Sequence, residues 1–258
     1  MFNLFRKKPK ANTEEIIVVT GANGFGGSKF KGESTWKYSC PVIAWKKPGH
    51  EINVEETRLF VEGQQEEIKK IINGISSDQV FKVAVIHENG KFTLVKALGK
   101  SSDTEMEEFL NKQLTPTHYT DEVLGKFLLN RSVNWFEKEI YWLGKKVRIS
   151  FESDSEEKMK HSCNMLRSII DDMDKWDKES RICASKDLLE LKNDVWLDED
   201  ESILTPEDFQ NRITLESIGI GSEEDIEFWF NDGDIFWGHS ICVYAHIKNG
   251  CVSANMLG

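Results

Sequence analysis

Short apolar runs separated by turn-forming residues fill the first half of the chain. These runs predict strands at residues 16–20, 42–45, 56–61, 80–87 and 91–98. The last two flank Glu88-Asn89-Gly90, and Asn-Gly between two β-rich runs is typical of a hairpin, because both residues tolerate positive φ. Two helices are also expected, one with Ile68, Ile71, Ile72 and Ile75 on one face and one after a capping box of Ser102 and Glu105.

The second half places strands around a block of helical spacing. Strands are expected at residues 127–129, 134–142, 146–151, 212–220, 224–230, 241–247 and 251–256, with turns at 143–145 and 248–250. Between them, apolar residues three or four positions apart predict two helices, one with Met159, Cys163, Leu166, Ile170 and Met173 and one with Ala184, Leu188, Leu191 and Val195. A capping threonine followed by proline at Thr205-Pro206 predicts a further short helix.

The order of these elements indicates the fold class. Strands followed by helices and again by strands predict an α+β protein rather than a repeating βαβ array. The segment 115–120 ends a helix and is expected to join two small domains, residues 1–118 and 119–258. We expect mostly antiparallel sheets with packed helices in both domains.

A glycine-rich segment follows the first predicted strand. Gly21, Gly24 and Gly27 have a spacing that resembles the phosphate-binding turn of short-chain dehydrogenases. In that fold the last glycine opens a helix, but residues 28–36 contain Gly32 and no apolar stripe. Tyr141 and Lys145 match the Tyr-x-x-x-Lys spacing of such enzymes, yet a predicted turn separates them. We therefore expect a loop between two strands and no bound cofactor.

Four polar side chains stand close together near the C-terminus, among five aromatic residues of the segment 228–243. Asp232, Asp234, His239 and Ser240 are the candidate catalytic residues, and the first three are also candidate metal ligands, because carboxylates and imidazole bind divalent metals and transfer protons. The spacing lacks the further acids of a calcium loop, and Ser240 lacks a nucleophile elbow. The alternative is structural: Asp232-Gly233 forms a hairpin turn between strands, residues 235–237 belong to the second strand, and His239 shares the apolar face of residues 241–247. We favour the structural interpretation.

Composition and charge narrow the classes of function. The net charge is −11, and residues 151–234 hold 25 acidic but only 9 basic side chains. Such a field repels nucleic acid and attracts basic partners, although it is also typical of a solvated surface. No apolar run approaches the roughly 20 residues of a spanning helix, the charges of the first ten residues follow their apolar patch, and the five cysteines are scattered. We expect a cytoplasmic protein without nucleic-acid or membrane partners.

Several segments of the second half carry a more specific signal. They are residues 135–137, 188–196, 204–209, 213–218, 254–258 and above all Asp232-Gly233-Asp234-Ile235-Phe236-Trp237-Gly238-His239-Ser240-Ile241. In this order they resemble the bacterial domain of unknown function 2262 family, from about Val123 to the C-terminus. The resemblance implies a bacterial cytoplasmic protein with an α+β domain, and it implies no activity or catalytic residue. The first 118 residues lie outside it.

Two classes of function stay open. The first is a non-enzymatic interaction or binding protein with a basic protein partner, for example an immunity-type protein. The second is an enzyme with a metal or acid–base site at Asp232, Asp234 and His239, or with a dehydrogenase-like nucleotide site at Gly21–Gly27. The acidic C-terminal half favours the first class.

Overall fold

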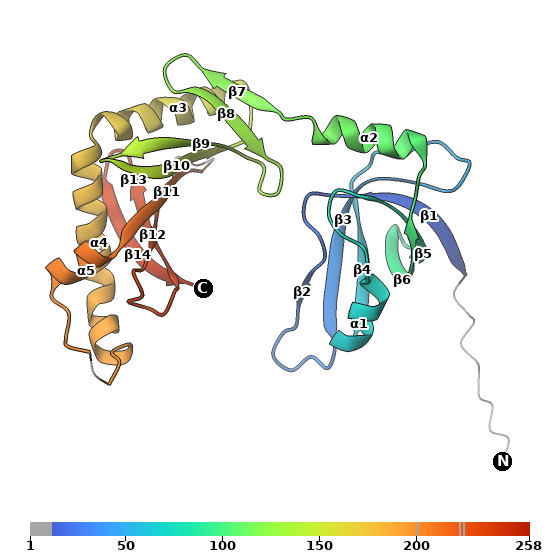
Figure 1. Cartoon of the computed structure of the whole chain (residues 1–258), viewed down its shortest axis with the longest axis horizontal. Helices are drawn as coiled ribbons and strands as arrows, with labels where there is room; N and C mark the ends of the chain where they lie inside the picture. Colours follow the sequence, from blue (N-terminus) through green and yellow to red (C-terminus); the bar gives the residue numbers. More distant parts are fainter. Residues whose placement is uncertain (1–11, 200, 222, 224) are drawn as a thin grey trace. The chain divides into compact units, whose positions relative to one another are not determined.

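The computed structural model describes residues 12–199, 201–221, 223 and 225–258. The chain divides into two compact units, the first ending at Thr115 and the second comprising Pro116–Gly258. Figure 1 shows the elements of both units, and each unit is described by itself.

The N-terminal unit is a small barrel with two helices. Its elements are β1 (Thr13–Thr20), β2 (Gly26–Ser28), β3 (Trp36–Lys46), β4 (Thr57–Gly63), α1 (Gln65–Ile72), β5 (Val80–Glu88), β6 (Lys91–Lys100) and α2 (Thr104–Leu114). The strand order is β1-β5-β6-β4-β3, and β1 also pairs with β3, so these five strands form a closed barrel. The short strand β2 pairs with β3 in addition. With β4 and β6 parallel and α1 between β4 and β5, this connectivity is that of the five-stranded OB-fold barrel.

Two apolar clusters hold this unit together. The barrel interior contains alternate residues of the strands together with Ile68 of α1. Met106 and Leu110 of α2 pack on the outside, against residues of β1, β3 and β5. The side chain of Asp103 accepts a hydrogen bond from the Met106 N–H at 3.2 Å, so Asp103 caps α2, one residue after the expected Ser102.

The C-terminal unit is an eight-stranded sheet with helices on one face (Figure 1). Its elements are β7 (His118–Asp121), β8 (Gly125–Asn130), β9 (Trp135–Trp142), β10 (Lys145–Glu152), α3 (Glu156–Asp171), α4 (Met173–Val195), α5 (Pro206–Arg212), β11 (Thr214–Ile220), β12 (Asp225–Asn231), β13 (Ser240–His246) and β14 (Gly250–Leu257). The strands follow one another in chain order across the sheet. β10 and β11 are parallel, because the three helices between them form a crossover connection.

Alternation along the strands separates the two faces of this sheet. In β10, Val147, Ile149 and Phe151 are buried in the core that the helices cover, whereas Arg148 and Ser150 point to the other face and are partly exposed. No helix of this unit that the structure describes covers this second face (Figure 1).

The predicted α+β class is confirmed, and in the described residues the sheets dominate over five helices. The hairpins at Asn89-Gly90, Leu143-Gly144 and Gly250 are confirmed too, and these residues have the positive φ that tight hairpin turns require. The expectation of mostly antiparallel sheets needs correction, because both sheets are mixed: β4 pairs in parallel with β6, and β10 with β11.

Two local predictions were wrong. Residues 235–237 form turns rather than a strand, and part of the expected linker, His118–Thr120, belongs to β7. No helix in the described residues is long and apolar enough to cross a membrane.

Candidate functional site

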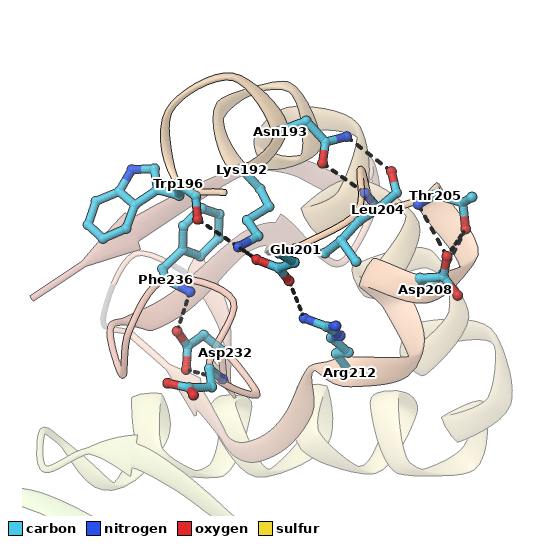
Figure 2. A network of polar contacts seen from close by, with 11 residues as sticks. Lys192, Asn193, Trp196, Glu201, Leu204, Thr205, Asp208, Arg212, Asp232 and Phe236 are labelled. Carbon is cyan, nitrogen blue, oxygen red and sulfur yellow. Dashed lines mark hydrogen bonds and ion pairs between the residues drawn. The ribbon is translucent and has the colours of Figure 1, made fainter. Parts of the chain in front are cut away.

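The segment 232–239, here called the Asp232 loop, joins β12 to β13. Asp232 is only 1% exposed, and its carboxylate accepts hydrogen bonds from three N–H groups of its own loop. Oδ2 accepts from Phe236 at 2.7 Å (Figure 2) and from Gly238 at 3.1 Å, while Oδ1 accepts from Asp234 at 3.1 Å. This carboxylate therefore organises the backbone of the loop.

The other three candidate residues lie apart from that carboxylate. Asp234 is exposed, and Ser240 begins β13 on the helix-free face of the sheet. His239 precedes β13 instead of extending its apolar face; its Nδ1 lies 2.5 Å from the Phe236 carbonyl oxygen, and its ring meets Trp196 edge-on, with 5.2 Å between centroids. In the described part of the chain, no three His, Cys, Asp or Glu side chains are grouped so that they could hold a metal ion.

The Asp232 loop has an unusual backbone. Gly233, Asp234, Trp237 and Gly238 all have positive φ. A Cβ atom at Gly233 would lie 2.4 Å from the carbonyl oxygen of Arg212, so only glycine fits against the end of α5. Positive φ is uncommon for a bulky residue, yet Trp237 adopts it at 56° and stays 60% exposed. The hydrogen bonds to Asp232 stabilise this strained conformation.

A buried ion pair supports the loop from the side of the helices. Lys192 of α4 has no exposed surface, and its Nζ donates to the carbonyl oxygen of Trp196 at 2.7 Å and to the carboxylate of Glu201 (Figure 2). Glu201 also accepts from Nη1 of Arg212 at 2.8 Å. The hydrogen bond from Lys192 holds the pKa of Glu201 below its usual value, burial opposes this, and Arg212 adds to the lowering. The position of Lys192 on the apolar stripe, four residues after Leu188, was the available sequence signal.

Neighbouring polar contacts connect the same segments. Asn193 exchanges two hydrogen bonds with the backbone of Leu204, at 2.9 and 3.0 Å. Thr205 and Asp208 form the capping box that begins α5 (Figure 2). The segments 188–196 and 204–209 therefore meet through hydrogen bonds, and the Trp196 ring joins the Asp232 loop to them by contacts with the rings of Phe236, Trp237 and His239. These contacts are a structural reason for the sequence patterns to occur together.

The glycine-rich segment contains no helix N-terminus. Residues 26–28 form β2, in which Gly27 pairs with Tyr38, and a Cβ atom at Gly27 would lie 2.4 Å from the Tyr38 ring. The first helix begins only at Gln65. The oriented N–H groups that hold a pyrophosphate in dinucleotide folds do not follow these glycines. Tyr141 and Lys145 lie on β9 and β10, on either side of a turn.

We therefore expect that calorimetric titration of the protein with NAD or NADP at millimolar concentration shows no saturable heat. Gly24→Val serves as the check, since Gly24 has space around it and the variant should fold. Saturable binding that Gly24→Val abolishes would contradict this expectation and restore a nucleotide site.

A groove that sequence reasoning missed lies on the helix-free face of the C-terminal sheet. This sheet groove has a volume of about 450 Å³, and its lining includes Trp135, Glu137, Arg148, Glu216, Glu227, Trp229 and Ser240. The Trp135 ring lies against Gly219, where a Cβ atom would come within 2.9 Å of it. Nε1 of Trp229 donates to Glu227 at 2.8 Å, and Nε of Arg148 lies 4.0 Å from Glu137. These residues come from five strands. The sequence could show only that each is a polar or partly exposed position of its own strand, and not that the five strands bring them together.

Family and structure comparisons show what the chain is similar to. A family described as uncharacterised proteins conserved in bacteria, DUF2262, matches residues 121–256, and a domain of unknown function, DUF7021, matches residues 1–113. No curated protein matches the chain. One solved structure, a replication protein A heterotrimer bound to single-stranded DNA, is 7% identical with a TM-score of 0.29. The match covers 67% of this chain and 45% of that one, and at this TM-score it supports no conclusion. The match over most of the C-terminal unit establishes that the chain belongs to the DUF2262 family of bacterial proteins.

Proposed function

We propose that the C-terminal unit is a non-enzymatic binding module that holds a basic protein partner in the sheet groove. The observation that carries this proposal is the lining of the groove, where two tryptophans and three glutamates surround a single arginine. Tryptophan faces attract lysine and arginine side chains, and carboxylates form charge-assisted hydrogen bonds with them.

The charge of the whole unit supports the same partner. Residues 116–258 hold 29 acidic and 16 basic side chains, whereas residues 1–115 hold 15 acidic and 17 basic ones. The negative charge of the protein is thus concentrated in the unit that carries the sheet groove. Such a field accelerates the association of a basic partner and makes the association sensitive to salt.

The arrangement of the Asp232 loop supports a binding protein rather than an enzyme. The Asp232 carboxylate accepts three backbone hydrogen bonds, and the Asp234 side chain is exposed to solvent. A general base must reach the proton that it removes, whereas the buried carboxylate of Asp232 already accepts hydrogen bonds from the backbone of its own loop. The five cysteines are free thiols, which supports the cytoplasmic location that we propose for the protein.

The test is the binding of a fluorescent peptide rich in lysine and arginine, measured by anisotropy. We expect Trp229→Ala and Glu216→Lys each to weaken binding about tenfold, since each removes a contact that is worth about 1–2 kcal/mol. Glu190→Lys on α4 is the matched control, because Glu190 is exposed and lies outside the groove. The affinity of this variant for the peptide should change by less than about twofold beyond the effect of the altered net charge.

A peptide rich in glutamate, of equal length, should not bind. Equal weakening by Glu216→Lys and Glu190→Lys would reduce the interaction to general electrostatics and contradict a specific groove. Failure of the basic peptide to bind at low salt would contradict the proposal altogether.

A further inference from the structure

We propose that the N-terminal barrel binds single-stranded nucleic acid in a groove on its outer surface. This barrel groove has a volume of about 630 Å³ and lies over β2, β3, β4 and β6. Its lining includes Lys37, Tyr38, Arg58, Phe60 and Lys91. The inference concerns the other unit and does not depend on the function proposed for the sheet groove.

Strand register explains why these side chains meet. Lys37 and Ser39 are two positions apart on β3, Arg58 and Phe60 on β4, and Lys91 and Thr93 on β6. Ser39 pairs with Phe60, and Phe60 pairs with Thr93, so all three strands present these residues on the same outer face. The interior face of the same strands carries Cys40, Leu59, Val61, Phe92 and Leu94.

The contacts of the three basic side chains leave them able to bind an anionic ligand. Nε and Nη2 of Arg58 donate to Oγ of Ser39 at 3.1 and 2.9 Å, which holds the guanidinium next to Ser39 in the groove lining. Lys91 Nζ lies 4.5 Å from the centroid of the Phe60 ring. Lys37 forms an exposed ion pair with Glu33, and a phosphate can compete with such a pair because it contributes little energy.

The acidic side chains near the groove do not cancel these charges. Glu62 is the carboxylate in the groove lining, and it accepts a hydrogen bond from Oγ1 of Thr35 at 2.6 Å. Residues 1–115 hold 17 basic and 15 acidic side chains, but four of the basic ones lie in residues 1–11, so the described part of this unit has 13 basic and 15 acidic side chains and is close to neutral. The large acidic excess belongs to residues 116–258. The expectation that the protein avoids nucleic acid rested on the acidic excess of residues 151–234, which belong to the other unit.

The combination of cations and an aromatic ring indicates the class of ligand. Three cations along a groove can follow a phosphate backbone, while the half-buried ring of Phe60 offers a surface on which an unpaired base can stack. A small anion would use the cations and leave the ring without a role. A single strand uses both, and its exposed bases distinguish it from a duplex.

The experiment measures anisotropy of a labelled oligomer of about 15 deoxythymidines with the full chain, at about 50 mM and about 200 mM salt. Neutralising three phosphates predicts a log–log salt slope of about −2, which is a loss of affinity of roughly 15-fold over this range. Arg58→Gln and Lys91→Gln, made separately, should each lower the slope by about 0.7 and weaken binding at low salt.

Phe60→Ala should weaken oligonucleotide binding about fivefold or more, since stacking of one base contributes about 1–3 kcal/mol, and should leave binding of dextran sulfate unchanged. Lys70→Gln is the matched control, because Lys70 is exposed on α1 and lies outside the groove lining. Circular dichroism of each variant shows whether the barrel is intact. Because the substitutions are made separately, the remaining variants still test the proposal if one of them does not fold.

Three outcomes would overturn the proposal. They are no binding at about 50 mM salt, an equal effect of Lys70→Gln and Lys91→Gln, and a Phe60→Ala effect that is the same for dextran sulfate as for the oligonucleotide. The last outcome would indicate a general polyanion surface. The peptide assay of the sheet groove uses other variants and another ligand, so the two proposals can fail independently.

Discussion

Glu201→Ala is expected to lower the free energy of unfolding of the C-terminal unit by about 3–5 kcal/mol. Lys192 has no exposed surface, and without the Glu201 carboxylate its ammonium group would keep only the Trp196 carbonyl oxygen of the two acceptors found here. A buried charge without its counter-charge is far more costly than the absence of the pair. The same substitution also removes the partner of Arg212, next to Gly233 and the Asp232 loop.

Urea denaturation followed by tryptophan fluorescence measures this effect, with hydrogen exchange of β1 and β5 as an internal reference in the other unit. Lys192→Met is the matched control. It removes the buried charge, while Glu201 keeps Arg212, so the expected loss is about 1 kcal/mol. A larger loss for Lys192→Met than for Glu201→Ala would contradict this account of the ion pair.

The same pair predicts a dependence on pH. The folded pKa of Glu201 is lowered, so its contribution to stability is present above about pH 4.3, the usual pKa of glutamate, and is lost as the pH falls through the lower folded value. Asp121 acts in the same direction. Burial would raise its pKa, but the Leu124 N–H and Arg167 outweigh burial and lower it. Glu201→Gln should therefore flatten the acid limb of the stability profile.

Asp232→Ala is expected to lower the free energy of unfolding by about 3 kcal/mol. The substitution leaves the N–H groups of Asp234, Phe236 and Gly238 without the acceptor that holds the Asp232 loop, and an unsatisfied buried donor costs about 1–3 kcal/mol. The Phe236 side chain beneath the loop is fully buried, so a disordered loop would also loosen core packing.

Asp234→Asn is the matched control for this substitution. Asp234 is exposed, and asparagine tolerates its φ of 67°, so the midpoint of denaturation should change by less than about 0.5 kcal/mol in free energy. Unchanged stability of Asp232→Ala would contradict the structural role of this carboxylate. A divalent metal bound to the unmutated protein and absent from Asp232→Ala would restore the metal site as an alternative.

The sequence by itself determined the elements whose signals are local. Asn89-Gly90 set the β5–β6 hairpin, because two consecutive residues that tolerate positive φ turn the chain without strain. Thr205-Pro206 set the start of α5 for an equally local reason, since the cap and the first helical residue are neighbours in the chain. The apolar stripes of α3 and α4 required only the helical period.

Only the tertiary structure decided which distant segments meet. The parallel pairs β4–β6 and β10–β11 join strands that are separated by other elements, and a strand's period of two carries no information about its partner. The same limit applies to the chemistry. Arg58 and Lys91 were polar positions of predicted strands, whereas Lys37 lay outside every predicted strand. Only pairing and register brought the three side chains to one face.

Burial of charge was decided at the same level. Asp232 and Asp234 are identical residues two positions apart, and the fold turns one carboxylate inward to three N–H groups and leaves the other in solvent. Lys192 lies on the apolar stripe of α4, but its sequence position does not identify its partner, and only the fold brings Glu201 against it. The energy of a charged side chain depends on which groups surround it in space, and neighbours in the chain supply only some of them.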